Sequence, residues 1–163
     1  MASNDENNNS NLPDHANVTI HPPILFGLLL VTGFGAGAIV PMPFLAERLA
    51  WIGGPIIVAA ALCLGSWGAL TMRAGGGSIP TGEPTDVIVT DGPYRYSRNP
   101  LYLSMVLALI GIGVWANSLW FVGMAIVDAV VLSKGVISRE EAYLRRKFGA
   151  QYSDYADSVR RWL

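Results

Sequence analysis

The sequence predicts an all-α membrane protein with about four transmembrane helices. Of its 163 residues, 52% are hydrophobic and only 14% are charged, and the mean hydropathy is +0.39, well above that of an average soluble domain. Charged residues are absent from the three blocks 22–46, 49–72 and 101–127. A helix of roughly 25 residues, rising about 1.5 Å per residue, crosses about 30 Å of hydrocarbon. We therefore expect residues 21–163 to form a single membrane-embedded domain.

Each of the first two blocks predicts one span. The third block continues to Ile137 with only Asp128 and Lys134 charged. It is too long for one span and about right for two, with a turn near residues 115–118. The expected spans are 23–42, 50–72, 100–116 and 118–136.

Basic residues favour one side of the predicted membrane. Arg48 lies on the short loop between the first two spans, and the other ten Lys and Arg residues lie on the opposite side. Basic residues close to span ends favour the cytoplasm, so loop 73–99 and the C-terminal tail are expected there. An even number of spans places the N-terminus in the cytoplasm too. Residues 1–20 are polar, rich in Asn and without a basic stretch, which predicts a disordered tail.

Several chemistries are excluded by the Cys and His usage. Cys63 is alone within a span, and the two histidines, His15 and His21, lie in or beside the tail. The polar loops therefore offer no His for a zinc site or a Ser-His-Asp triad, and no metal is expected. The net charge of -1 comes with no groove-reading motif, so nucleic acid is not an expected partner.

A polar motif, GPYRYSRNPLYL at residues 92–103, precedes the third span directly. Pro100 suits the first position of a helix, and Asn99 suits the N-cap before it. The free N–H groups of a helix start, with Arg95 and Arg98 nearby, suit an anionic group such as a carboxylate or phosphate. The alternative is that these Arg and Tyr side chains only anchor the span at the membrane interface.

The tail 138–163 is the second polar concentration. Its apolar spacing predicts two helices on the cytoplasmic interface, separated at Gly149. Ser138 and Glu141 have the spacing of a capping box, which leaves Glu140 unexplained. Adjacent glutamates at this depth are costly unless a cationic or hydroxyl-rich group binds them.

Two features inside the spans need separate explanations. Gly33 and Gly37 in the first span have the spacing of a helix-packing face. Asp128 is a mid-span carboxylate, which usually faces a cavity or a partner. It could line a tunnel for a substrate, or pair with Lys134 or with nearby Tyr and Trp side chains.

The motif GPYRYSRNPLYL, the sequence Arg139-Glu140-Glu141 and the ending FGAQYSDYADSVRRWL together resemble the isoprenylcysteine carboxyl methyltransferase and phospholipid methyltransferase superfamily. The resemblance covers most of residues 21–163. It implies a small helical membrane enzyme that binds S-adenosylmethionine in a cytoplasm-facing pocket, under the loop and the tail. It also implies that membrane lipids surround the enzyme and that a lipophilic methyl acceptor arrives from the bilayer.

The family's motifs match Arg98, Asn99, Pro100, Tyr102, Glu140 and Glu141, and the charge and position of other residues suggest further roles. The expected cofactor-binding residues are Tyr94, Arg98, Asn99, Pro100, Tyr102, Glu140 and Glu141. Arg139 is the candidate catalytic residue, which would hold the reacting carboxylate of the acceptor. The remaining acceptor-binding candidates are Asp128, Tyr152 and Arg160, with Arg161 as an alternative to Arg160.

The acceptor class stays open at this stage. An isoprenylcysteine-type carboxylate is favoured, because it is already ionised and needs no base. A phospholipid amine or a thiol would need a proton acceptor such as Glu140. A non-enzymatic four-helix scaffold or transporter subunit is the alternative from another class. By analogy with the family, the expected location is the cytoplasmic membrane of a prokaryote.

Overall fold

The structure is a computed structural model that describes residues 20–78 and 85–163. Residues 1–19 of the expected disordered tail and residues 79–84 of the long loop lie outside the described residues. Within the described ranges the structure is helical and has no strand. Its elements are α1 (Pro22–Ile39), α2 (Glu47–Ala74), the short 3₁₀ helix η2 (Gly92–Arg95), α3 (Pro100–Trp115), α4 (Trp120–Val131), the π-helical segment η3 (Leu132–Ile137), α5 (Ser138–Phe148) and α6 (Ala150–Ser158).

The helix lengths and their apolar composition confirm the predicted all-α membrane fold. Three helices are long and apolar enough to cross a membrane: α1 with 18 residues, α2 with 28, and a continuous helix of 29 residues from Trp120 to Phe148. Helix α3 is apolar as well but has only 16 residues. The predicted turn between the third and fourth spans lies where it was expected, between Trp115 and Trp120.

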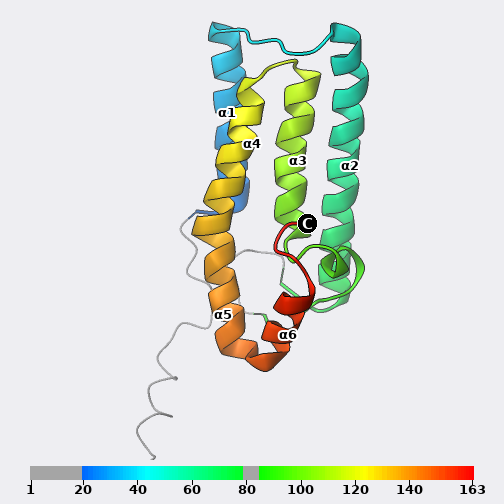
Figure 1. The fold of residues 1–163 in the computed structure, drawn as a ribbon, viewed down its shortest axis with the longest axis vertical. Helices are drawn as coiled ribbons and strands as arrows, with labels where there is room; N and C mark the ends of the chain where they lie inside the picture. Colours follow the sequence, from blue (N-terminus) through cyan, green and yellow to red (C-terminus); the bar gives the residue numbers. More distant parts are fainter. Residues whose placement is uncertain (1–19, 79–84) are drawn as a thin grey trace, which may run out of the picture.

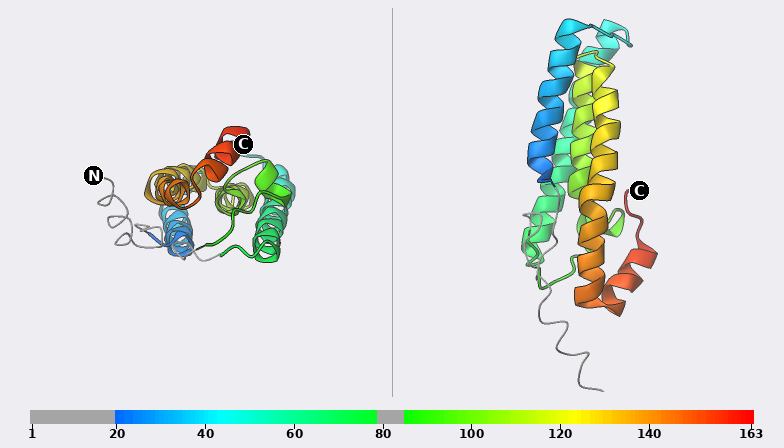
Figure 2. Two further views of the ribbon diagram at one scale, coloured as in Figure 1. Left: turned by 90° about the horizontal axis from the view of Figure 1, so that it is seen from below. Right: turned by 90° about the vertical axis from the view of Figure 1, so that its left-hand side faces the viewer.

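The two helices predicted for the tail are α5 and α6, but α5 continues the fourth span instead of starting a new helix. Helix α4 continues through η3 into α5 without a break, because no residue before Gly149 terminates it (Figure 2). Gly149, with φ of 54°, then ends α5 as predicted. The predicted capping box is also wrong, since Ser138 lies inside the helix and its hydroxyl donates to the Lys134 carbonyl oxygen at 2.7 Å.

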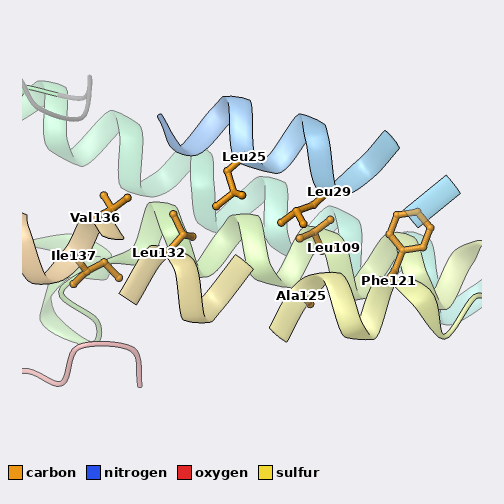
Figure 3. Close-up of a cluster of buried hydrophobic side chains, with 8 residues drawn as sticks. All are labelled: Leu25, Leu29, Leu109, Phe121, Ala125, Leu132, Val136 and Ile137. Atoms are coloured by element: carbon orange, nitrogen blue, oxygen red, sulfur yellow. The ribbon is translucent and has the colours of Figure 1, made fainter. Parts of the chain in front are cut away.

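The four long elements stand side by side in the order α1, α4, α3, α2 (Figures 1 and 2). The core lies between α1, α3 and the α4–α5 helix, where the side chains of Figure 3 meet. These core residues are Leu25, Leu29, Leu109, Phe121, Ala125, Leu132, Val136 and Ile137. The remaining surface of the spans is apolar and exposed, as expected for helices in contact with lipid.

The loop between α1 and α2 crosses the bundle above the α3–α4 turn, and Asn117 holds it there. The Asn117 Oδ1 accepts hydrogen bonds from the backbone N–H groups of Phe44 and Leu45, both at 3.0 Å. Its Nδ2 donates to the Leu45 carbonyl at 2.9 Å. Trp120 Nε1 donates to the Val40 carbonyl at 2.9 Å. These bonds attach the α3–α4 turn to the loop at the end of the bundle opposite to α5 and α6.

Small residues allow the helices to approach closely. Gly33 and Gly37 of α1 lie against Phe121 and Ser118, which confirms the predicted packing face. Helices α2 and α3 have a similar contact at Gly111. An added Cβ there would lie 2.8 Å from the backbone nitrogen of Val58.

We expect Gly111→Ala to lower the apparent melting temperature of the purified protein in detergent. The new methyl group would meet the α2 backbone, which cannot rotate away, and such overpacking costs about 1–3 kcal/mol. Gly27→Ala is the matched control, because a Cβ at Gly27 has no heavy atom within 4 Å. Equal melting of the two variants would contradict the close approach of α2 and α3.

Candidate active site

The polar motif before α3 lies beside the C-terminal segment that follows α6 (Figure 1). Pro100 is buried at the start of α3, as predicted. Asn99 occupies the N-cap position but makes no side-chain cap. Its Nδ2 donates instead to the Arg161 carbonyl at 2.9 Å, and the backbone N–H of Arg98 donates to the Arg160 carbonyl at 3.0 Å. The chain's last residues are therefore held at the α3 N-terminus.

Glu141 joins two arginines from different parts of the chain. Its Oε1 lies 3.2 Å from Arg98 Nη1. Its two oxygens accept from Arg161 Nε at 3.0 Å and Nη2 at 2.6 Å. The Glu141 side chain is only 9% exposed, which strengthens both charge pairs relative to pairs in open solvent.

The Arg98 guanidinium retains hydrogen-bonding capacity at this point. Its Nη1 is close to Glu141 but not aligned for a hydrogen bond, and its Nε has no hydrogen-bond partner within the described ranges. The Arg98 side chain is 12% exposed. A buried cationic N–H without an acceptor is costly, so this group is suited to receive an anionic ligand.

Glu140 directly precedes Glu141 on α5, and its side chain contacts α3. The Tyr102 hydroxyl donates to Glu140 Oε1 at 2.7 Å, which connects α3 to α5. Tyr94 of η2 is buried, and its hydroxyl donates to the Gly68 carbonyl at 3.4 Å. Burial and then the charge of Glu140 raise the pKa of Tyr94 to about 12, so Tyr94 remains protonated near neutral pH.

Two tyrosines of α6, Tyr152 and Tyr155, lie close to these residues. Tyr152 is 3% exposed. Burial and then the Glu141 charge raise its pKa, while Arg98 opposes this shift. The Tyr155 hydroxyl donates to the Tyr94 carbonyl at 2.8 Å, which ties α6 to η2. We refer to Arg98, Asn99, Tyr102, Glu140, Glu141, Tyr152 and Arg161 as the polar cluster.

Five predicted site residues are not part of the polar cluster: Tyr94 and Pro100, which are buried beside it, and Arg139, Arg160 and Asp128. Arg139 is exposed on α5. The exposed Arg160 contributes its backbone carbonyl to Arg98. Asp128 lies 12 residues before Glu140 on the same continuous helix, which corresponds to roughly 18 Å along the helix axis.

Asp128 is fully buried on the core face of α4. Neither of its carboxylate oxygens has a hydrogen-bond partner among the described residues, and Lys134 is exposed. Of the two alternatives for Asp128, pairing with Lys134 or with neighbouring Tyr and Trp groups is therefore not observed among the described residues. An ion pair or hydrogen bond with another described side chain therefore does not account for the carboxylate at position 128.

Sequence reasoning underestimated the C-terminal segment. Arg161 was only a secondary candidate, yet it makes the bidentate contact with Glu141. Trp162 packs against the core, and its Nε1 donates to Ser133 Oγ at 3.2 Å. The sequence predicted that the second tail helix includes Trp162, whereas α6 ends at Ser158 and residues 159–163 are not helical.

Chemically, the polar cluster presents both signs of charge at one end of an apolar bundle. The α3 N-terminus and Arg98 favour an anion, while Glu140 and Glu141 favour an ammonium or hydroxyl groups. Such a cluster can bind a zwitterionic ligand beside the membrane. Among the described residues, no group of three or more His, Cys, Asp or Glu residues is arranged to hold a metal ion.

The apolar helices and the polar cluster at their end define an integral membrane protein with a polar site close to the bilayer surface. The chain belongs to the phospholipid methyltransferase family, whose sequence model matches residues 44–151. This confirms the resemblance inferred from the motifs and makes the protein a membrane methyltransferase. The matched region includes Arg98, Tyr102, Glu140 and Glu141 and ends before Arg161.

Individual relatives match shorter parts of the chain. An uncharacterized protein of Haemophilus influenzae is 44% identical over 64 residues, which are 39% of this chain and 100% of that protein. The cobalt-zinc-cadmium resistance protein CzcN of Cupriavidus metallidurans is 29% identical over 76 residues, 47% of this chain. The nickel-cobalt-cadmium resistance protein NccN of Alcaligenes xylosoxydans xylosoxydans has the same identity and coverage. The match spans 35% of the length of each of the two resistance proteins.

Proposed function

We propose that this protein transfers a methyl group from S-adenosylmethionine to a lipophilic acceptor at the membrane surface. The observation that carries the proposal is the meeting of Arg98, Glu140 and Glu141 at the start of α3. These residues come from two segments about 40 residues apart, and the contacts place them at the end of the apolar helices. A methyltransferase of this family needs a polar cofactor site that an acceptor can reach from the bilayer.

The polar cluster fits the functional groups of S-adenosylmethionine. The buried Arg98 Nε has no acceptor among residues 20–78 and 85–163, which suits the carboxylate of the methionine part. Glu140 accepts a hydrogen bond from Tyr102, and a carboxylate has further acceptor capacity that suits the ammonium or a ribose hydroxyl. When bound, the cofactor supplies an electrophilic methyl group on a sulfonium. The protein then has to orient the acceptor and exclude water.

An isoprenylcysteine-type carboxylate is the acceptor we favour. It is ionised at neutral pH and needs only a cation to hold it, because methyl transfer to a carboxylate releases no proton. We propose Arg139 for this role, since it lies on α5 next to Glu140. Arg160 is at the surface of the C-terminal segment and could contact the same acceptor.

A phospholipid amine is the second candidate, and the Glu140–Tyr102 pair favours it. An amine must lose a proton during the reaction, and Glu140 is a carboxylate held in place by a 2.7 Å hydrogen bond. The name of the family points the same way. The two acceptors are separated by the chemistry of the product, because a methyl ester is labile to base and an N-methyl group is not.

The polar cluster is proposed to face the cytoplasm, where S-adenosylmethionine is available. Support comes from the basic residues, of which Arg48 alone lies at the opposite end, in the first turn of α2. Arg145, Arg146 and Lys147 end α5 on the side of the polar cluster. The positive-inside preference therefore supports a cytoplasmic location for this end of the bundle.

We expect Glu140→Gln to weaken binding of S-adenosylmethionine by roughly 10- to 100-fold, because one charge-assisted contact is lost. Binding is measured by calorimetry on the purified protein in detergent. Transfer of radiolabel from the cofactor to prenylcysteines, aminophospholipids and thiols then identifies the acceptor. Tyr102→Phe should cause a smaller loss of affinity, since it removes only the bond that positions Glu140.

Glu47→Gln is the control variant, because Glu47 starts α2 at the opposite end of the bundle. It should bind the cofactor as the unaltered protein does. Absence of cofactor binding in the unaltered protein, or unchanged affinity after Glu140→Gln, would refute the proposed site. If cofactor binds but no acceptor is labelled, the cofactor assignment stands and the acceptor assignment fails.

A further inference from the structure

A cavity lies at the end of the bundle opposite to the polar cluster. Its volume is about 460 Å³, within the range of roughly 300–1,000 Å³ that is typical of ligand sites. Glycines 33 and 37 of α1 form one wall, and the loop 41–43 and the α3–α4 turn form the rest. The Phe121 ring closes its inner side.

The cavity wall is apolar except for the polar groups of the α3–α4 turn. Asn117 has its carbonyl oxygen and its amide engaged by the loop above. Ser118 is different: it is 7% exposed, it lines the cavity, and its Oγ has no hydrogen-bond partner in the described part of the chain. A buried hydroxyl without a partner is unfavourable, so a ligand with a hydrogen-bond acceptor is favoured in this cavity.

The depth of the cavity in the membrane follows from the tryptophans around it. Trp115 and Trp120 flank the turn that carries Ser118. Trp51 packs edge to face against Trp115, with ring centroids 6.3 Å apart. Tryptophan is enriched at the level where lipid head groups meet the acyl chains, so Ser118 lies near the depth of lipid ester groups.

The mouth of the cavity is apolar as well. Phe34 is 55% exposed and Met42 is 38% exposed, and both line it. A ligand from the bilayer can therefore enter along α1 without passing a charged side chain. The cavity is therefore suited to an apolar chain that carries a hydrogen-bond-accepting oxygen at one end.

We propose that this cavity binds an acyl chain of a glycerophospholipid, with the Ser118 hydroxyl donating a hydrogen bond to the ester carbonyl. The site is separate from the proposed methyl-transfer site. Helix α4 starts beside Ser118, and Glu140 is 20 residues beyond that start, roughly 30 Å along the helix axis. The bound lipid therefore belongs to the leaflet opposite to the polar cluster and is not the methyl acceptor.

The test uses phosphatidylethanolamine with a photoreactive diazirine in one acyl chain, mixed with the purified full chain in detergent. After irradiation, mass spectrometry compares labelling of the cavity segments 33–43 and 116–121 with labelling of 56–70, a part of α2 with exposed apolar side chains on one face. We expect saturable labelling of the cavity segments at least fivefold above α2. Unlabelled lipid should compete for it.

Two variants and a matched control define the site. Ala38→Phe fills the cavity and should reduce the specific labelling to the level of α2. Gly35→Phe adds the same ring to the same helix where a side chain has open space, and should retain labelling. Ser118→Ala should weaken the lipid affinity by roughly 2- to 10-fold, the value of one hydrogen bond.

Non-saturable labelling, equal on α2 and the cavity segments, would show ordinary contact with bulk lipid and overturn the proposal. Unchanged labelling of Ala38→Phe would do the same. If Ala38→Phe fails to fold, Ser118→Ala decides alone, because removal of one hydroxyl oxygen leaves the packing intact. Unchanged affinity of Ser118→Ala would then contradict the assigned hydrogen bond.

Discussion

Replacement of Glu141 by Gln is expected to abolish methyl transfer almost completely, with a loss of at least 100-fold. Glu141 is the common counter-charge of Arg98 and Arg161, and its side chain is only 9% exposed. Without it, two neighbouring guanidinium groups repel each other, and the C-terminal segment loses its attachment to α5. Breaking a buried pair on one side costs about 3–5 kcal/mol, and the 40% exposure of Arg161 reduces that figure.

The measurement is the rate of radiolabel transfer, accompanied by the apparent melting temperature. Glu141→Asp is the matched variant, because it keeps the negative charge but has a side chain one methylene shorter, which weakens the contact with Arg161. We expect it to recover part of the activity. Full activity of Glu141→Gln would show that the pairs with Arg98 and Arg161 do not organise the site.

Replacement of Asp128 by Val is expected to raise the apparent melting temperature by about 2–12 °C. The Asp128 carboxylate is fully buried within α4, and neither of its oxygens has a partner in the described part of the chain. An unpaired polar group of this kind costs about 1–3 kcal/mol, and each kcal/mol corresponds to roughly 2–4 °C in a chain of this size. The apolar Val side chain removes the cost.

The same variant tests the predicted role of Asp128 in acceptor binding. A more stable protein with at least tenfold slower methyl transfer would support that role, because functional residues often reduce stability. Asp128→Asn keeps the shape and removes the charge, so it shows whether the charge is what the acceptor requires. A stable Asp128→Val protein with unchanged methyl transfer to every acceptor would contradict the prediction that Asp128 binds the acceptor.

Much of the fold could be predicted because the charge-free blocks and the turn at Asn117 are local properties of the sequence. The start of α3 at Pro100 and the end of α5 at Gly149 are also local, and both were predicted correctly. The meeting of Arg98 with the glutamates was expected only from the resemblance. No short-range pattern relates residues that are more than 40 positions apart.

Two features were beyond sequence reasoning for physical reasons. The π-helical segment at Leu132–Ile137 inserts a wider turn, so the burial pattern changes phase before Glu141. A regular helical period cannot anticipate this. The C-terminal segment after α6 has no periodic secondary structure, and its contacts depend on backbone carbonyls that every residue possesses.

The continuous helix from Trp120 to Phe148 has a consequence for how the protein depends on its membrane. Its 29 residues extend for about 44 Å, which exceeds a hydrocarbon layer of about 30 Å by roughly 14 Å. Glu140 and Glu141 are therefore fixed at a set height on a rigid rod whose other end is anchored among tryptophans. In a thicker bilayer, such as a sterol-rich one, the lipid head groups lie closer to these glutamates. In a thinner bilayer the head groups lie further from them. Bilayer thickness thus tunes the distance between the polar cluster and the lipid head groups of one leaflet.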